Sequence, residues 1–575
     1  MLSVLASWLI IFAVSLIFGY FTIHVLYGRG AETLWKPDVY LVCGLMVINV
    51  YAQVFSLFYK VGAMACCLLF FLGVICFVWI VFYAKREGRL NVPPKRGLWA
   101  GLTARKNIII LTVVCVAATL FWTTSKPIHY DTYLYHIQTI KWIEEYGIVP
   151  GLGNLYFRFA YNSAFMTLQA LFGLEWLLGQ SLHTVNGYIC SLAIIYALAD
   201  NRLLKQERPE LSDLFKVAMI LYVYCEREYI SSPNSDILTM LLILYICAKW
   251  SEFIERDIRD ALPYTYLCVL GVWAVTVKLS ASVCIILAVY PLVLLIKRKQ
   301  WKALTVNLCV GVSIVLPWLA RNIMISGYLL YPYPQMDFFS VDWKMPESVV
   351  TFDSREIMVW GRAIKDVNLF DMPVWEWFPA WFKNVPHLIT IAGFGSALTL
   401  GIYIFYGLIV VKKQDVRKTV LFGYSILALF AWFFSAPLIR YGRVYLFIPI
   451  CEVVRMILEW KKDSERLQKS ARCVIGLLMI PIFCIYLSSW GTAENLPRGM
   501  QENYQWYLTD TMELADGINI WYPVEGDQGS YDVFPCVPYR AMVEKIEMRG
   551  DSMKDGFRIK EEYADMHING AGYEW

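Results

Sequence analysis

Apolar runs long enough to cross a bilayer recur along most of this 575-residue chain, and they constrain its fold more than any other feature. A helix needs about 20 predominantly apolar residues to cross the hydrocarbon core. Hydrophobic residues make up 58% of the chain and charged residues 17%, and the mean hydropathy is +0.50. A soluble domain has roughly 45–50% apolar and about 25% charged residues. Soluble, disordered, fibrous and disulfide-scaffold classes are therefore excluded.

The apolar runs predict an all-α polytopic membrane protein with about 13–14 transmembrane helices. The first run has no basic segment before it and no small-residue cleavage site, so we interpret it as a retained span. Segment 163–178 is also apolar, but we expect a half-inserted or surface-packed helix there. The predicted spans lie at roughly 2–27, 39–58, 62–83, 107–123, 181–199, 215–230, 236–250, 263–277, 280–296, 303–320, 388–411, 419–436, 443–459 and 472–489.

Basic connectors between the spans predict the orientation of the chain, because cytoplasmic loops retain Lys and Arg during insertion. All of these connectors fall on one side if segment 163–199 crosses only once, whereas a second crossing there would invert every loop downstream. We therefore expect a multi-pass protein of a bacterial cytoplasmic membrane, with the N-terminus and the tail outside. The basic connectors are 84–107, 201–210, 297–302, 411–418 and 459–472.

The order of spans and loops divides the chain into three parts. Residues 1–106 hold the N-terminal spans and a basic cytoplasmic loop, and residues 107–489 form a membrane core with long outer loops at 124–162 and 321–387. Residues 490–575 form an extracytoplasmic tail, which is small for an autonomous core and should pack on the outer face of the bundle. Because 51 Lys and Arg nearly balance 47 Asp and Glu, nucleic acid is excluded as a partner.

The first outer loop carries the strongest candidate for a catalytic group. A helical pattern starts at Asp131, with an apolar stripe on one face and Asp131, Tyr135 and Gln138 on the other. Such a helix lies along the membrane surface, and we expect its polar face to meet a cavity. Asp131 is either the N-cap of this helix or a general base, and the two roles are compatible.

Cations at the outer ends of spans are the second signal. Positive charge there opposes the insertion bias, and a lipid phosphate would explain it, because Arg binds phosphate bidentately and Lys serves as a point charge. The competing explanation is snorkelling at a span end, or pairing with Glu226, Glu228 or Asp236. The candidate phosphate ligands are Lys278, Arg321, Arg440 and Arg443.

Asp236, in the turn SPNSD, is a helix cap, or else a second acid or metal ligand that faces Asp131. We interpret His136 as a structural histidine. Most of the 15 cysteines lie inside apolar runs, and no His, Cys and Asp cluster has the spacing of a metal site. We therefore predict no cofactor, which leaves a divalent metal open but without a ligand cluster.

The segment 120–200 resembles the GT-C superfamily, the polytopic glycosyltransferases that use lipid-linked sugar donors. A span ends near Trp122, and an acid follows in YDTYLYH. A surface helix, the turn GIVPGLGNL, the stretch YFRFAYNS and an apolar segment closed by LFG come next. In such enzymes the Asp of the first outer loop acts on the acceptor hydroxyl, and Asp131 matches it. The chain departs from the pattern at Thr132, where related families have a second acid, and in the three spans that precede the motif.

The motifs SPNSD, KLS, RNxxxSGYLLYP, APLIRYGR and PCVPY also resemble uncharacterised membrane proteins of bacterial surface-polysaccharide clusters. The resemblance to GT-C enzymes implies inverting transfer from a polyprenyl-phosphate or diphosphate donor to an extracytoplasmic acceptor in surface polysaccharide assembly. A repeat-unit polymerase or ligase needs the same parts. Two different functions compete with transfer: a flippase for a lipid-linked saccharide, and a structural scaffold. The expected partners are the bilayer, a polyprenyl-linked saccharide, a saccharide acceptor and the polysaccharide assembly machinery.

Overall fold

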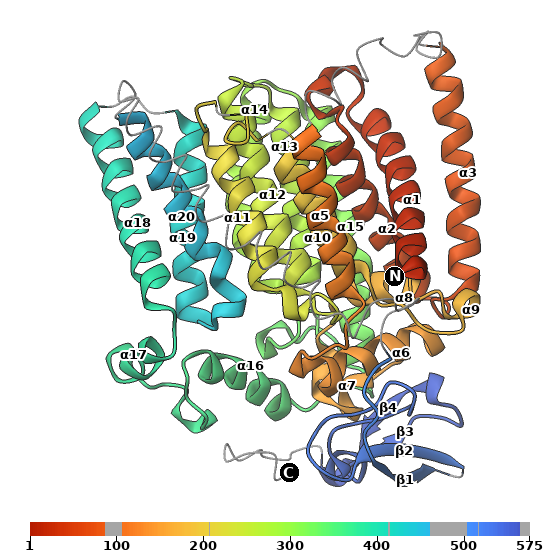
Figure 1. The fold of residues 1–575 in the computed structure, drawn as a ribbon. Helices are drawn as coiled ribbons and strands as arrows, with labels where there is room; N and C mark the ends of the chain where they lie inside the picture. The colour runs from red at the N-terminus through yellow and green to blue at the C-terminus, as the bar shows by residue number, and fades with distance from the viewer. Residues whose placement is uncertain are drawn as a thin grey trace.

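Helices running side by side make up most of the structure, a computed structural model (Figure 1). It describes residues 1–86, 106–199, 201–205, 207–411, 415–460, 503–515 and 517–563. Within these residues, nine helices are long and apolar enough to cross a membrane. The prediction of a mainly α-helical, polytopic membrane protein is confirmed at this level.

The predicted spans match helices within a few residues, apart from 472–489, which lies outside the described residues. The nine long segments are α1 (Leu2–Leu26), α2 (Pro37–Ser56), α3 (Ala63–Arg86), α5 (Lys106–Thr123), α12 (Asp236–Glu255), η6 with α14 (Leu279–Ala288 and Val289–Lys297), α15 (Trp301–Ser326), α18 running into η9 (His387–Tyr406 and Gly407–Val411) and α19 (Val416–Ser435). Four further helices stand among them: α10 (Val185–Ala199), α11 (Leu211–Cys225), α13 (Ala261–Val277) and α20 (Ile439–Trp460).

The connectors of the bundle gather at two opposite ends (Figure 1). One end, called the basic end here, carries the described residues between α10 and α11 and the Arg298–Gln300 connector between α14 and α15. The other end, called the loop end, carries the segment between α5 and α10 and the segment between α15 and α18. The predicted separation from the long loops therefore appears for connectors 201–210 and 297–302, whereas most of 84–107 and 459–472, and residues 412–414 of the connector 411–418, lie outside the described residues.

Segment 163–178 packs at the loop end and does not form a long helix. Its first helix, α8 (Ala164–Leu171), has eight buried residues and packs against α2 and α6 (Ile137–Tyr146). Eight residues rise about 12 Å, far short of a hydrocarbon core about 30 Å thick. A second helix, α9 (Glu175–Leu178), has four residues. The arrangement agrees with the prediction of a surface-packed helix.

Short elements fill the loop end. They are the π-helix η3 (Thr132–His136), α7 (Leu152–Leu155), η4 (Phe157–Ala160), η5 (Arg227–Tyr229), η7 (Pro334–Met336), α16 (Glu347–Gly361), η8 (Val367–Leu369) and α17 (Val374–Lys383). Near the C-terminus, β1 (Thr509–Ala515) pairs antiparallel with β2 (Ile518–Pro523), and β3 (Ile546–Met548) with β4 (Phe557–Ile559). The remaining short helices are η1 (Gly28–Leu34), α22 (Arg540–Val543), η11 (Met553–Asp555) and η12 (Glu561–Tyr563).

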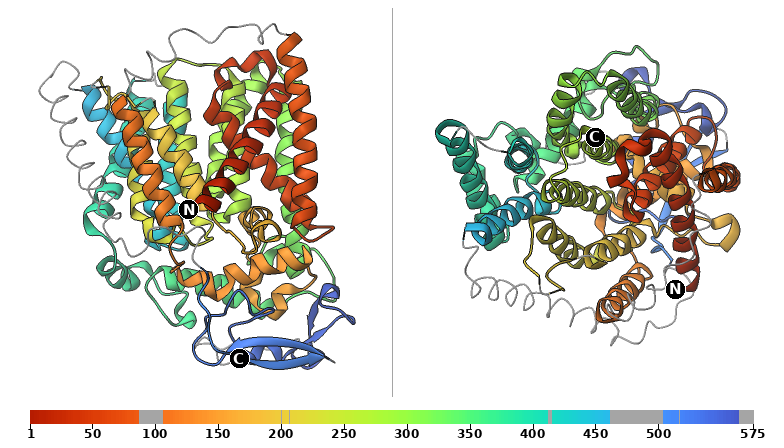
Figure 2. Two further views of the ribbon diagram at one scale, coloured as in Figure 1. Left: turned by 45° about the vertical axis from the view of Figure 1, so that its right-hand side comes forward. Right: turned by 90° about the horizontal axis from the view of Figure 1, so that it is seen from above.

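The described part of the tail packs on the loop end, as predicted, and forms a hydrophobic core with it (Figure 2). The backbone N–H of Phe557 donates to the carbonyl of Pro150 at 3.0 Å. Gly151 has a φ of +65°, and a Cβ there would lie 2.0 Å from the carbonyl oxygen of Phe557. The turn GIVPGLGNL thus uses a glycine where β4 comes close.

The expectation that the polar face of the surface helix meets a cavity is wrong at Gln138. Its side-chain amide donates to the carbonyls of Ser530 and Val533 at 2.6 and 2.9 Å. Its carbonyl accepts the backbone N–H of Cys536 at 3.0 Å. The tail therefore covers this part of the helix, and its backbone supplies the hydrogen bonds that the buried amide of Gln138 requires.

Candidate functional site

Asp131 lies at the start of the surface helix, as predicted, but its side chain makes no capping hydrogen bond there. Instead, its Oδ2 accepts a hydrogen bond from Nη2 of Arg440 at 2.8 Å. Arg440 stands in the first turn of α20. A residue of the long loop between α5 and α10 and a predicted phosphate ligand therefore meet, although 309 positions separate them in the chain.

His129 and Tyr441 surround the Asp131–Arg440 pair. Nη1 of Arg440 lies 3.1 Å from Nε2 of His129, and Nη2 donates to the hydroxyl of Tyr441 at 2.8 Å. The backbone N–H of His129 donates to Ser232 Oγ at 3.3 Å, which ties this segment to the turn SPNSD. The guanidinium is thus held between segment 129–131 and Tyr441 of its own helix, and the turn SPNSD supports segment 129–131.

A second acid–cation pair adjoins the first. Lys278 follows the last turn of α13 and donates to Asp236, the first residue of α12. The ammonium of Lys278 also lies 3.6 Å from the centre of the Tyr441 ring, and the guanidinium carbon of Arg440 lies 4.8 Å from it. Tyr441 therefore joins the two pairs through its ring, an arrangement in which both cations gain cation–π attraction.

A third pair lies one helical turn along α20, where Arg443 donates to Glu226. Lys278 and Arg443 are therefore paired with Asp236 and Glu226, two of the acids named as candidate partners. We call the six residues of the three pairs the acid–cation cluster: Asp131, Arg440, Asp236, Lys278, Glu226 and Arg443. The cluster is partly accessible to solvent, because the side chains of Arg440, Arg443 and Lys278 are 34%, 23% and 21% exposed.

Burial and the nearby charges together determine the pKa values of Asp131, His129 and His136. Burial pushes the pKa of Asp131 up, but Arg440 and then His129 more than offset it, so the pKa lies below its usual value. Burial lowers the pKa of His129, and it lowers that of His136 to about 3. At neutral pH an ionised Asp131 therefore lies among neutral histidines.

His136 predicts a pH dependence of stability. Its pKa is about 3 in the folded chain and about 6.5 in the unfolded chain, so the stability from keeping it neutral is complete above about pH 6.5. As the pH falls from there towards 3, the unfolded state takes up the proton first and stability is lost. His136→Phe keeps a ring against Tyr135 but cannot titrate. Between pH 7.5 and 5, the melting temperature of the variant should therefore fall less steeply than that of the wild type. Equal slopes for the two proteins would contradict the lowered pKa of His136.

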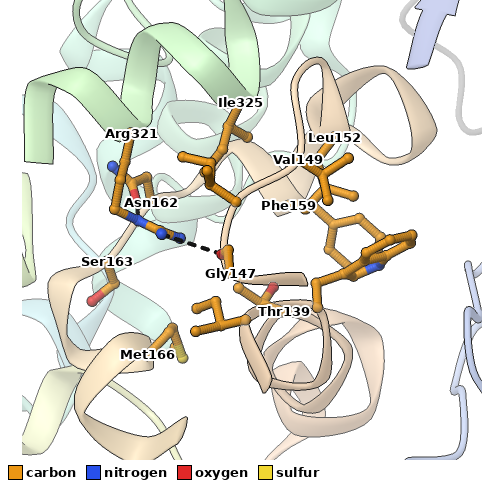
Figure 3. A pocket seen from close by; sticks show the side chains of 13 residues that line it. Thr139, Gly147, Val149, Leu152, Phe159, Asn162, Ser163, Met166, Arg321 and Ile325 are labelled. Atoms are coloured by element: carbon orange, nitrogen blue, oxygen red, sulfur yellow. Dashed lines mark hydrogen bonds between the residues drawn. The ribbon is translucent and has the colours of Figure 1, made fainter. Parts of the chain in front are cut away.

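Arg321 is not brought to the acid–cation cluster, and Figure 3 shows its side chain directed at the Gly147 carbonyl. Arg321 is buried and donates to Asn162 Oδ1 at 3.0 Å, Ser56 Oγ at 2.6 Å and the Gly147 carbonyl at 3.3 Å. These neutral acceptors tie α15 to α2 and to the turn after α6. The prediction that groups Arg321 with the other cations is wrong about its place, because its side chain points into the loop-end core.

A second group of charged and tyrosine side chains, which the sequence did not predict, lies near Asp131. Arg158 donates to Glu356 at 3.1 Å, and its charge also helps to lower the pKa of Asp131. Tyr161 donates to Asp353, and burial raises the pKa of that carboxyl to about 7. The Tyr161 ring lies 5.6 Å from that of Tyr135, on the surface helix.

The missed group has a signal in the sequence. Asp353 and Glu356 lie three residues apart on the buried face of α16, which is otherwise apolar. Two acids on an apolar face indicate a buried basic partner, and Arg158 in YFRFAYNS is the basic residue that pairs with them. In the part of the chain that the structure describes, no group of three or more His, Cys, Asp and Glu side chains could hold a metal ion.

The fold and the cluster define a multi-pass helical protein with ion pairs gathered at one end of its bundle. The chain belongs to a family defined as a domain of unknown function, DUF8201, whose model matches residues 1–447. The match includes all six residues of the acid–cation cluster. No curated protein and no solved structure matches the chain.

Proposed function

We propose that this chain is a membrane glycosyltransferase of GT-C type, which transfers a sugar from a polyprenyl-phosphate or diphosphate donor to an acceptor hydroxyl. The site would lie on the extracytoplasmic side of a bacterial cytoplasmic membrane, in surface polysaccharide assembly. The observation that carries the proposal is the contact of Asp131 with Arg440. It unites a candidate general base with a candidate ligand of the leaving phosphate.

In the proposed reaction, the Asp131 carboxylate accepts the proton of the acceptor hydroxyl while the hydroxyl oxygen attacks C1 of the sugar. The bond between C1 and the donor phosphate oxygen breaks, and its electron pair leaves with the polyprenyl phosphate. Arg440 and Lys278 stabilise that charge, since fixed cations in a partly desolvated site act strongly on developing negative charge. Asp131 then loses its proton to water.

The ion pair between Arg440 and Asp131 supports a role for Arg440 as a switch. While Arg440 pairs with Asp131, the lowered pKa makes that carboxylate a weak base. A donor phosphate competes for the guanidinium, which is one-third exposed and prefers bidentate anions. When Arg440 turns to the phosphate, the pKa of Asp131 rises, so the base becomes effective only after the donor is bound.

The reaction itself can be tested with the purified full chain in proteoliposomes. Lipid-linked saccharides extracted from the native membranes serve as donors, and the extracted polysaccharide fraction serves as acceptor. Mass spectrometry should detect the release of polyprenyl phosphate or diphosphate together with an acceptor extended by the sugar. Disappearance of the donor lipid from one leaflet without cleavage would favour a flippase instead.

Sidedness is a separate prediction. The positive-inside rule assigns the basic end to the cytoplasm and the loop end to the outside. In a variant whose exposed cysteines are replaced by serine, an impermeant thiol reagent should label Ser340→Cys in intact cells. Lys299→Cys, and cysteines introduced within 84–107, should react only after the membrane is opened. The opposite pattern would contradict the extracytoplasmic site.

A further inference from the structure

A cavity of about 680 Å³ lies inside the bundle, away from the acid–cation cluster. It is lined by residues of α2, α10, α11, α12 and α13, together with residues that precede α2 and α11. None of the six cluster residues lines it. Along α12 its wall runs from Leu238 to Glu252 and on to Arg256, a rise of about 27 Å. The cavity therefore extends along most of the length of a membrane-spanning helix.

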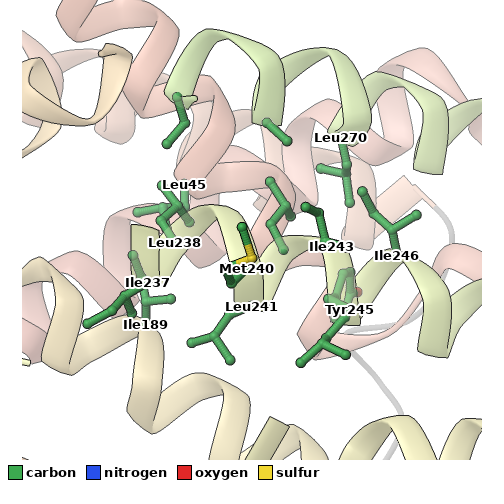
Figure 4. Close-up of a cluster of buried hydrophobic side chains, with 14 of the residues drawn as sticks. Leu45, Ile189, Ile237, Leu238, Met240, Leu241, Ile243, Tyr245, Ile246 and Leu270 are labelled. Atoms are coloured by element: carbon green, nitrogen blue, oxygen red, sulfur yellow. The ribbon is translucent and has the colours of Figure 1, made fainter. Parts of the chain in front are cut away.

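The lining of the cavity changes character along its length. Towards the loop end it is apolar, with leucine and isoleucine side chains from three helices facing one another (Figure 4). Towards the basic end it carries six cationic and three acidic side chains. The apolar residues drawn in Figure 4 that also line the cavity include Leu45, Ile189, Leu238 and Leu241.

Three lysines share two carboxylates at the basic end of the cavity. The ammonium of Lys249 lies 2.6 Å from Asp38 and 3.0 Å from Glu252. Lys216 lies 2.9 Å and Lys36 3.6 Å from the same Glu252. We call Lys36, Lys216 and Lys249 the lysine cluster. With its two carboxylate partners it has a net charge of +1.

The two carboxylates have further partners. Tyr245 donates to Asp38 and Tyr196 donates to Glu252, each at 2.9 Å. Burial lowers the pKa of Lys36, and the positive charge of Lys249 adds to this effect. Because buried charge is stable only when it is compensated, the excess positive charge favours an anion as a further partner.

The other charged side chains at this end do not change that net charge, because Arg202 with its two carboxylate partners carries −1, and Lys205, Arg256 and Glu207 together carry +1. Arg202 pairs with Asp213 and Glu255, each at 3.0 Å. Lys205, Arg256 and Glu207 lie at the exposed mouth. Ile195 also lines the cavity and is 43% exposed, so the cavity reaches the apolar surface of α10 as well as the polar end of the bundle.

We propose that this cavity binds one membrane phospholipid whose headgroup has a net negative charge, with the phosphate at the lysine cluster and the acyl or isoprenoid chain along α10 and α12. Basic pockets between transmembrane helices on the cytoplasmic side are suited to such headgroups, and the apolar wall adds the burial of a chain. The site is separate from the proposed transfer site and does not depend on it.

Native mass spectrometry of the purified full chain tests this proposal after exchange into nanodiscs of phosphatidylglycerol or phosphatidylcholine. The wild type should retain one phosphatidylglycerol and release phosphatidylcholine. Lys36→Gln leaves two lysines with two carboxylates, a neutral group, so retention should weaken by about tenfold or more. Lys36 has a side chain 29% exposed, so its loss should leave the fold intact.

Ala193→Trp provides an independent variant, because it fills the cavity without removing a charge. It should abolish retention while the elution profile stays monodisperse. Lys302→Gln, exposed at the same end and outside the cavity, should behave as the wild type. Equal retention of both lipids, or unchanged retention by Lys36→Gln, would overturn the proposal.

Inorganic phosphate distinguishes a lipid headgroup from a soluble phosphate. If phosphate raises the melting temperature of the wild type but not of Lys36→Gln, and no lipid is retained, the cavity binds a soluble phosphate compound and the lipid proposal is wrong. Retention of phosphatidylglycerol in the presence of millimolar phosphate supports the lipid, because the chain then adds affinity that free phosphate lacks.

Discussion

Sugar transfer by the Asp131→Asn variant should be lower than that of the wild type by about 10²–10⁴-fold, the usual contribution of a general base. The amide is nearly isosteric with the carboxylate and still accepts a hydrogen bond from Arg440. It cannot take a proton at neutral pH. Product per unit of protein, measured in proteoliposomes or as surface polysaccharide of the complemented cell, checks this expectation.

The control for Asp131→Asn separates loss of the base from loss of the ion pair. The double variant Asp131→Asn, Arg440→Gln replaces the pair by two neutral hydrogen-bonding groups and should restore any melting temperature lost in the single variant. It should not restore activity. Near-normal product from a well-expressed Asp131→Asn variant would leave Asp131 as a structural partner of Arg440 and nothing more.

Arg440→Gln is expected to have the second largest effect, a loss of about 10²–10³-fold, comparable to removing one charge-stabilising donor from an active site. Arg440→Lys keeps the charge but loses the fork that holds a phosphate through two hydrogen bonds, so it should recover only part of the rate. Lys344→Gln, a cation at the loop end paired with exposed Asp337, is the matched control and should be unaffected.

The pH profile of the Arg440→Lys and Arg440→Gln variants distinguishes the proposed switch from a structural role. Arg440 lowers the pKa of Asp131, so its neutralisation raises that pKa. A base works only above its pKa, and the acid limb of the Arg440→Gln profile should therefore move to higher pH. The limb of Arg440→Lys should move less. Identical limbs in all three proteins would mean that Asp131 is not the titrating base.

The spans were predictable from the sequence because hydropathy is a local property. A run such as 2–27 or 236–250 needs no knowledge of its neighbours to be recognised, and the helices α1 and α12 begin within a few residues of it. Segment 163–178 was ambiguous by hydropathy alone. Its short helix is fixed by packing against α2 and α6, which no local pattern contains.

The candidate site was predictable only in part. Asp131, Lys278 and Arg440 could each be chosen from their type and their place at a span end, but the pairs they form depend on which helix ends meet. The same limit explains Arg321, whose direction into the core depends on Asn162 and Ser56. The lysine cluster could not be predicted for a different reason. Its three lysines lie at or near the ends of spans, where a lysine is explained by cytoplasmic orientation alone.

A cryo-EM structure of the full chain in nanodiscs containing polyprenyl phosphate would show whether Asp131, Arg440 and Lys278 form the donor site. We expect a phosphate within hydrogen-bonding distance of Arg440 and Lys278, with the Arg440–Asp131 contact broken and the Asp131 carboxylate facing the space beside the phosphate. A polyprenyl phosphate bound elsewhere, with the Asp131–Arg440 contact intact at its present 2.8 Å, would contradict this expectation.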